Sequence, residues 1–151
     1  MAISVLYVDD EEFNLVGFKS SFRRDFQVHT ANSAKKGLEI LEKEEIQVVL
    51  SDQRMPEMTG VEFFEEVRAK YPFAVRILVT GYTDMNALVE AVNKGNIYKY
   101  INKPWNNDHL KKVIEAAYDL YQARKNESED KNKLARANEQ LEYMLRQKLL
   151  S

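Results

Sequence analysis

The sequence lacks cysteine and contains only two histidines, His29 and His109. Without cysteine, disulfides, thiolate nucleophiles and cysteine-based metal sites are excluded. Two histidines are too few for a histidine-rich metal centre, and a histidine-based catalytic triad is not expected. His29 has no acidic neighbour in the sequence and is predicted to be a half-buried strand residue. Any chemistry in this chain must therefore come mainly from carboxylates, hydroxyls and amines.

Long apolar runs and a strong net charge are also missing. No apolar run approaches the roughly 20 residues that cross a bilayer, and the N-terminus turns acidic too early for a signal peptide. We therefore expect a cytoplasmic chain without a membrane partner. With 22 basic and 24 acidic residues, the formal net charge is -2. This balance does not favour direct binding to nucleic acid, which prefers a basic surface.

Short apolar runs, rich in β-branched residues, predict five β-strands. They lie at residues 3–8, 26–30, 46–51, 75–80 and 97–101. The first, third and fourth runs are almost continuously apolar, which is typical of strands buried on both faces of a parallel sheet. Strand and helical spacing alternate five times, so we expect a doubly wound α/β sheet with function at the carboxyl ends of its strands.

Four stripes of apolar residues at helical spacing separate the predicted strands. The stripes consist of Leu15, Phe18 and Phe22, of Ala34, Leu38 and Leu41, of Phe64, Val67 and Tyr71, and of Met85, Leu88 and Val92. Ser33 and Asp84 are expected helix N-caps. Gly95 stands where a helix end favours a left-handed residue.

The C-terminal part is free of helix breakers, because all five glycines and all three prolines lie at or before Pro104. We expect Trp105 to anchor a helix whose first part covers the sheet and completes a domain of residues 1–121. A largely polar stretch at 122–133 opens a helical extension, residues 122–151. The heptad phase of the covering helix resumes there, at Leu134, Asn138, Leu141 and Leu145.

Asn138 would occupy an a position between leucines, which fixes the register of two-stranded coiled coils. A homodimer through the C-terminal helix is therefore one interpretation of the extension. The other is a solvated or frayed tail, because the apolar seam is short and interrupted.

Polar side chains follow four of the predicted strands, at the point where each strand ends. Asp9 and Asp10 follow the first strand, and Asp52 follows the third. Thr80 ends the fourth strand, and Lys103 follows the fifth. Because parallel strands end at one edge of a sheet, three carboxylates, a hydroxyl and an ammonium should converge there. One lysine cannot neutralise three carboxylates, so Mg²⁺, which prefers carboxylate oxygen, is the expected cofactor.

Each of these residues also has an ordinary structural interpretation. Asp10 can favour the start of the next helix, Asp52 can cap a turn, and Lys103 can lie on the surface. Their coincidence at four strand ends instead indicates phosphoryl chemistry. An aspartate can attack phosphorus to give an acyl phosphate, while a metal ion, a lysine and a hydroxyl stabilise the transferring oxygens.

Four motifs carry a family resemblance: LYVDDEE, VVLSDQRMPEMTG, ILVTGYTD and YKYINKPW. From about Ile3 to Tyr121, the chain resembles the receiver domain of two-component response regulators. The resemblance implies a flavodoxin-like (βα)₅ fold with strand order 2-1-3-4-5, followed by the extended C-terminal helix. It also implies that Asp52 accepts a phosphoryl group from a sensor histidine kinase or a phosphotransfer protein.

The same resemblance implies a metal site. Asp10 and Asp52 would bind Mg²⁺ directly, together with the backbone carbonyl of Arg54. Asp9 would act mainly through water.

The resemblance further implies a switch. Thr80 and Lys103 would contact the phosphoryl oxygens, and Tyr100 would turn inward when Thr80 moves. The surface of the fourth and fifth helices and the fifth strand would then change. Pro104 would follow a cis peptide bond.

Arg54 and Tyr82 occupy the positions that tune the phosphoryl lifetime in this family. Both are bulky, so we expect them to obstruct water and slow self-dephosphorylation. A Mg²⁺-dependent aspartyl-phosphate phosphohydrolase is the alternative function. Such a hydrolase would use a second acid two residues after its nucleophile for proton transfer, but position 54 is arginine. We therefore favour a signalling switch that catalyses only its own phosphorylation and dephosphorylation.

Overall fold

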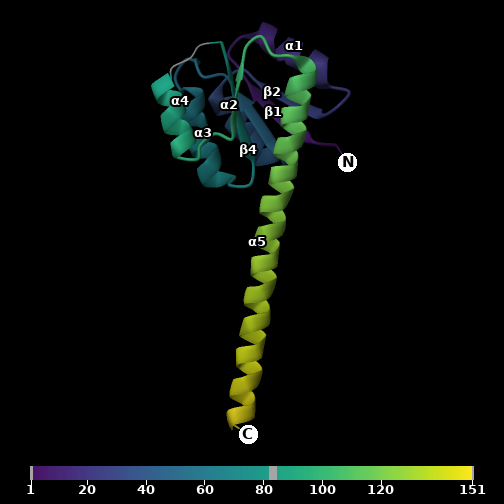
Figure 1. Cartoon of the computed structure of the whole chain (residues 1–151), viewed down its shortest axis with the longest axis vertical. Helices are drawn as coiled ribbons and strands as arrows, with labels where there is room; N and C mark the ends of the chain where they lie inside the picture. The colour runs from purple at the N-terminus through teal and green to yellow at the C-terminus, as the bar shows by residue number, and fades with distance from the viewer. Residues whose placement is uncertain (1, 82–84, 151) are drawn as a thin grey trace. The chain divides into compact units, whose positions relative to one another are not determined.

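The computed structural model describes residues 2–81 and 85–150 (Figure 1). Its elements are β1 (Ser4–Val8), α1 (Glu12–Phe22), β2 (Gln27–Ala31), α2 (Ala34–Lys43), β3 (Val48–Ser51), α3 (Gly60–Lys70), β4 (Val75–Thr80), α4 (Met85–Asn93), β5 (Lys99–Asn102) and α5 (Asn107–Leu150). The predicted alternation of strands and helices is confirmed, and the strand ends lie within two residues of their predicted positions. Within the described residues, no helix is long and apolar enough to cross a membrane.

The five strands form one parallel sheet in the order β2-β1-β3-β4-β5, which confirms the predicted topology. Every residue of β1, β3 and β4 is buried, as expected for strands covered on both faces. Val8 of β1 pairs with Ser51 of β3, so these neighbouring strands end side by side. This register places Asp9 and Asp52 at adjacent strand ends. His29 lies half-buried in β2, as predicted.

Two hydrophobic cores cover the two faces of the sheet. Alternate residues of β1 enter different cores because successive side chains of a strand point to opposite faces. Val5 and Tyr7 pack with residues of α1 and of the first part of α5. Leu6 and Val8 pack with residues of α2, α3 and α4. The three inner strands are therefore buried on both faces, and the polar side chains Asp9, Asp52 and Thr80 are buried at their ends.

Two of the three predicted helix-end residues are confirmed. Ser33 accepts a hydrogen bond from the backbone N–H of Lys36, as an N-cap does. Gly95 follows α4 with a φ of 73°, a left-handed conformation that favours glycine. Asp84 lies outside the described residues.

One prediction about α4 is wrong. Val92 was expected on the buried stripe, but it is 57% exposed, whereas Ala91 is 1% exposed. The buried face of α4 continues from Leu88 by a step of three residues instead of four. The side chain of Met85, which completes the predicted stripe, lies outside the described part.

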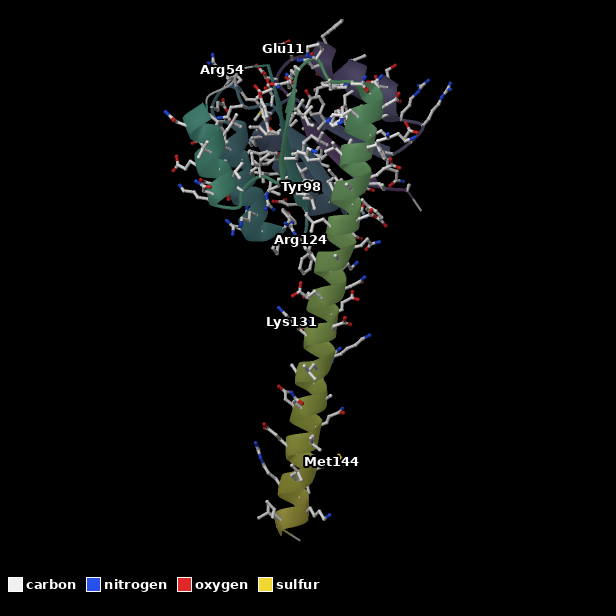
Figure 2. All side chains as sticks on the ribbon, in the orientation of Figure 1. Glu11, Arg54, Tyr98, Arg124, Lys131 and Met144 are labelled. Carbon is white, nitrogen blue, oxygen red and sulfur yellow. The ribbon has the colours of Figure 1, made fainter. Side chains whose placement is uncertain are left out.

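The uninterrupted helix predicted after Pro104 is confirmed, because α5 runs from Asn107 to Leu150. The chain divides into two compact units, Met1–Tyr121 and Gln122–Ser151. The second unit is helical throughout its described part, and all its residues from 129 to 150 are exposed, including Lys131 and Met144 (Figure 2). Its large exposed apolar residues are Leu134, Leu141, Tyr143, Met144, Leu145, Leu149 and Leu150. Pairing of this helix with a second copy stays a prediction.

Candidate functional site

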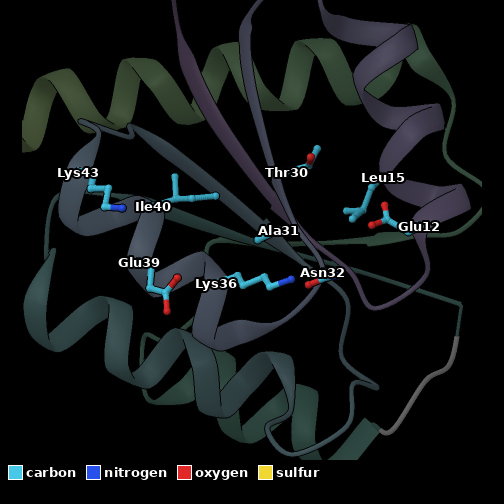
Figure 3. A pocket seen from close by; sticks show the side chains of 9 residues that line it. All are labelled: Glu12, Leu15, Thr30, Ala31, Asn32, Lys36, Glu39, Ile40 and Lys43. Atoms are coloured by element: carbon cyan, nitrogen blue, oxygen red, sulfur yellow. The ribbon is translucent and has the colours of Figure 1, made fainter.

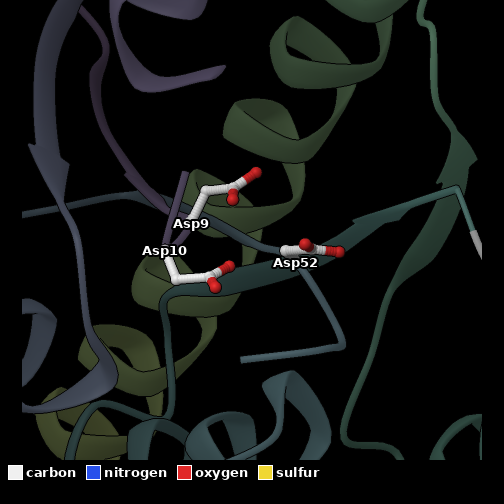
Figure 4. Close-up of side chains that lie close together, drawn as sticks. All are labelled: Asp9, Asp10 and Asp52. Atoms are coloured by element: carbon white, nitrogen blue, oxygen red, sulfur yellow. The ribbon is translucent and has the colours of Figure 1, made fainter. Parts of the chain in front are cut away.

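Three carboxylates lie together at the carboxyl edge of the sheet. Asp9 and Asp10 follow β1, and Asp52 follows β3 (Figure 4). Each residue offers one carboxylate oxygen, and these oxygens all lie within 4.8 Å of one another. Asp9 and Asp52 are buried, and Asp10 is exposed. Such a cluster of negative charge needs cations or hydrogen-bond donors to be stable in the folded state.

Lys103 supplies a cation to this cluster from the end of β5. Its Nζ lies 2.8 Å from Asp9 Oδ2 and 3.2 Å from Asp52 Oδ2. Burial lowers the pKa of the Lys103 ammonium, but the hydrogen bonds and charges of Asp9 and Asp52 outweigh burial and raise the pKa. Lys103 therefore stays protonated at neutral pH and bridges two of the three carboxylates. The peptide bond between Lys103 and Pro104 is cis, as predicted.

The Asp9 carboxylate is held by four donors. Its Oδ2 accepts hydrogen bonds from the Tyr7 hydroxyl at 2.6 Å, from Lys103 Nζ at 2.8 Å and from Asn14 Nδ2 at 3.2 Å. Its Oδ1 accepts a bond from the backbone N–H of Glu11 at 3.0 Å. Because most of its lone pairs are occupied, Asp9 is less suited than Asp10 or Asp52 to bind a metal ion directly.

Sequence reasoning missed Tyr7 and Asn14. A signal for Tyr7 was present, because residues two apart on a strand share a face, and Tyr7 stands two before Asp9. Burial first, and then the hydrogen bond and charge of Asp9, raise the pKa of the Tyr7 phenol. Tyr7 is therefore a permanent donor to Asp9. Asn14 lies in the first turns of α1, and the sequence does not indicate its contact with Asp9.

The loop after β3 holds Asp52 tightly. Asp52 Oδ1 accepts a hydrogen bond from the backbone N–H of Gln53 at 2.8 Å. Gly60 closes the loop by donating from its N–H to the carbonyl of Gln53 at 3.0 Å. A Cβ at position 60 would lie 2.3 Å from the Asp52 carbonyl oxygen, so the close approach requires glycine. Thr59 and Glu62 form a capping box that starts α3 directly after the loop.

Four further residues were predicted to belong to the site, and the structure describes three of them. Thr80 is buried at the end of β4, and its carbonyl accepts a bond from the Lys103 N–H at 3.1 Å. Tyr100 is half-buried, and its hydroxyl donates to Asn102 Oδ1. Arg54 is exposed in the loop after β3 (Figure 2). Tyr82 lies outside the described residues.

A separate hollow of about 340 Å³ lies between α1 and α2, beside the edge strand β2 (Figure 3). Its charged lining consists of Glu12, Lys36, Glu39 and Lys43. Two acids and two amines do not select a ligand of either charge.

Comparison with protein families shows which family the chain belongs to. The family model described as the response regulator receiver domain matches residues 5–115. The chain belongs to this family. The match spans β1 to the first part of α5, and it includes every strand end that contributes to the acidic site.

Curated relatives of this receiver domain are longer regulators. It is 42% identical over 114 residues to the hydrogenase transcriptional regulatory protein HoxA of Cupriavidus necator. It is 32% identical over 122 residues to the regulatory protein AtoC of Escherichia coli. These alignments cover 76% and 80% of this chain but 24% and 26% of the relatives. The receiver domain thus spans about a quarter of the length of the curated relatives it matches.

Solved structures share the same fold. A CheY-like response regulator receiver domain from Methanospirillum hungatei is 29% identical, with a TM-score of 0.77, and the match covers 82% of this chain and 99% of that chain. A structure described as adenylate cyclase from Rhodopirellula baltica is 30% identical, with a TM-score of 0.83, and the match covers 88% and 99%. The flavodoxin-like fold predicted for this receiver domain is therefore confirmed.

Proposed function

We propose that this receiver domain is a phosphorylation switch in which Asp52 accepts a phosphoryl group from a histidine kinase or a phosphotransfer protein. The observation that carries this proposal is the position of Asp52. It is only 8% exposed, lies at a strand end within the acidic cluster, and has the Lys103 ammonium 3.2 Å away. Asp9 is also buried beside Lys103, but its carboxylate already accepts four hydrogen bonds. Family membership supports the same assignment.

The residues at the site fit a Mg²⁺ ion. Their donors are carboxylate oxygens within 4.8 Å of one another, and Mg²⁺ favours oxygen ligands. We infer that Asp10, Asp52 and the backbone carbonyl of Arg54 would hold the ion, with Asp9 acting through water. When bound, Mg²⁺ would neutralise negative charge on the oxygens of the transferring group.

In the transfer step, a carboxylate oxygen of Asp52 forms a bond to phosphorus. The bond from phosphorus to the histidine nitrogen of the donor breaks, and its electron pair stays on that nitrogen. Lys103 offsets the charge of the phosphoryl oxygens from its position beside Asp52, and the Thr80 hydroxyl donates a hydrogen bond to one of them. The product is an acyl phosphate at Asp52.

The new charge at Asp52 would shift a two-state equilibrium of the surface formed by α4, β5 and the first part of α5. Thr80 moves toward the phosphoryl group, and Tyr100 turns into the space that Thr80 vacates. This surface already exposes apolar side chains, at Val89 and Val92 of α4 and at Tyr98 before β5. Large exposed apolar groups are suited to a partner that binds only one of the two states.

The helical extension is proposed to pair with a second copy of the chain. Leu134, Leu141 and Leu145 are exposed on the helix and share a heptad phase with Asn138. Burial of these leucines in a two-stranded coiled coil would remove them from water, and the paired asparagines would set the register. Phosphorylation could then act on the pairing of two extensions. HoxA, one of the curated relatives, is named as a transcriptional regulatory protein, so we infer that the output is transcriptional and is exerted through parts other than the receiver domain.

Incubation with acetyl phosphate and Mg²⁺, followed by intact-mass spectrometry, tests the switch. We expect at most one phosphoryl group per chain, and none on the Asp52→Asn variant. Free phosphate should be released slowly, because Arg54 and Tyr82 are expected to obstruct water. Continuous release of phosphate from small esters would instead support a phosphohydrolase, and labelling of Asp52→Asn at the wild-type level would refute the proposed acceptor.

A further inference from the structure

Tyr7 is a buried polar side chain that the proposed transfer step does not use. It lies in β1, two residues before Asp9, and therefore shares the face of the strand on which Asp9 follows. Its residue exposure is zero, as is that of Asp9. A phenylalanine ring would make the same contacts with the core, so the hydroxyl needs a separate explanation.

Aromatic packing fixes the ring of Tyr7. Its centroid lies 4.7 Å from that of Phe18 in α1 and 6.0 Å from that of Trp105, whose ring is perpendicular to it. Such a packed ring has little freedom to rotate or shift. The hydroxyl is therefore presented to Asp9 Oδ2 at 2.6 Å by a rigid support.

The other donors to the same oxygen are less firmly committed to Asp9. Lys103 is shared with Asp52, and in the proposed transfer step it also serves the phosphoryl group. Asn14 Nδ2 lies 3.2 Å from Asp9 Oδ2 and 3.4 Å from Glu11 Oε2, so this amide is also shared between two carboxylates. The Tyr7 hydroxyl makes the shortest of the three bonds, and its donor group is buried.

We propose that Tyr7 is a positioning residue for the Mg²⁺ site, because its hydroxyl holds the Asp9 carboxylate in place beside Asp10 and Asp52. The proposal rests on the proposed function only in taking this acidic cluster as the Mg²⁺ site. Partners that orient the groups around a metal ion commonly change metal affinity tenfold or more when they are removed. Tyr7 would act through Asp9 and would not touch the ion.

The Tyr7→Phe variant removes the hydroxyl and keeps the ring that packs on Phe18 and Trp105. Tyr121→Phe is a matched control, because the Tyr121 hydroxyl also donates to a carboxylate, Glu45 Oε1, at 3.1 Å. That pair lies at the opposite edge of the sheet, before β3 begins. Both variants lose one phenol hydroxyl bonded to one acid, and only one of these acids belongs to the site.

Isothermal titration calorimetry with Mg²⁺ on the full chain tests the proposal without any phosphoryl donor. We expect Tyr7→Phe to raise the Mg²⁺ dissociation constant roughly tenfold, and Tyr121→Phe to leave it within about twofold. Asn14→Ala, at a half-exposed position, removes the longer bond to the same oxygen and should weaken binding by a smaller factor. Circular dichroism at the titration temperature checks that each variant is folded.

The outcomes separate the two proposals. If the unsubstituted chain binds Mg²⁺ and Tyr7→Phe matches Tyr121→Phe, Tyr7 has only a packing role, and the phosphorylation switch stands without it. Tighter binding by Tyr7→Phe would also overturn the positioning role. If the unsubstituted chain does not bind Mg²⁺, the metal site of the proposed function and the role of Tyr7 both fail.

Discussion

Replacement of Arg76 by methionine should destabilise the receiver domain strongly. Arg76 lies in the apolar strand β4 and is 4% exposed. Its Nε donates to the carbonyl of Asn96 at 2.8 Å, and its terminal nitrogens donate to the carbonyls of Ala74 at 2.9 Å and Gly95 at 3.0 Å. Two of these acceptors belong to the connection between α4 and β5. Arg76 therefore links the connection after α4, a helix of the proposed switch surface, to strand β4.

The magnitude follows from two opposing effects. A hydrogen bond from a charged donor contributes roughly 1.5–3 kcal/mol, so three such bonds exceed about 4 kcal/mol. Methionine removes the buried charge and with it part of a desolvation cost of several kcal/mol. We expect a net loss of about 3 kcal/mol in the free energy of unfolding, which lowers the melting temperature of a domain of this size by roughly 10 °C.

Arg68→Met is the matched control for this prediction. Arg68 is exposed on α3, and it contacts the same connection through the carbonyl of Lys94 and the side chain of Asn96. An exposed substitution of this kind should cost about 0.5 kcal/mol or less. Urea unfolding followed by circular dichroism measures both variants. Equal losses for Arg76→Met and Arg68→Met would refute the argument that burial makes the Arg76 bonds important.

Two further predictions concern a close backbone approach and an alkaline transition. Gly60→Ala should lower the free energy of unfolding by about 2–3 kcal/mol, because its Cβ would meet the Asp52 carbonyl. Gly17→Ala in α1 should instead raise it by up to about 1 kcal/mol, because nothing lies within 4 Å of a Cβ there. Equal unfolding free energies of the two variants in urea would contradict this prediction. Burial, and then the hydrogen bond to Glu45, raises the pKa of Tyr121 to about 12 from 10.0. As the pH rises, the Tyr121 phenol therefore loses its proton in the unfolded chain before it does so in the folded chain. The contribution of Tyr121 to the free energy of unfolding should be fully present below pH 10 and be lost as the pH rises through about 12. Denaturant unfolding of wild type and Tyr121→Phe at pH 9 and about 11.5 tests it, and an identical decline in both would exclude Tyr121 as the cause.

The sequence was sufficient to predict the sheet and the acidic cluster, because both depend on local patterns. Continuous apolar runs marked the buried strands, and parallel topology then required Asp9, Asp10 and Asp52 to meet at one edge. The left-handed glycine at position 95 followed from its place after a helical stripe. These features depend on spacing along the chain, which the sequence shows directly.

The partners of buried polar groups were much harder to predict. The acceptors of Arg76 include carbonyls 19 and 20 residues away, and any residue has a carbonyl, so no side chain marks them. Val92 and Ala91 compete for one buried position in α4, since helical spacing allows steps of three or four. The small alanine fits closely against the sheet, and the larger valine faces outward. Tertiary packing, which the spacing does not encode, decides between the two.

The most direct test of the proposed function is to locate the phosphoryl group among three neighbouring acids. After brief incubation with acetyl phosphate and Mg²⁺, fragment-ion mass spectrometry at low temperature can assign the modified residue. The phosphoryl group should be on Asp52, because the Lys103 ammonium lies 3.2 Å from its carboxylate and because four hydrogen bonds already occupy the Asp9 carboxylate. A phosphoryl group on Asp9 or Asp10, or an acid-stable phosphate on Ser51, would contradict the assignment of Asp52 as the acceptor.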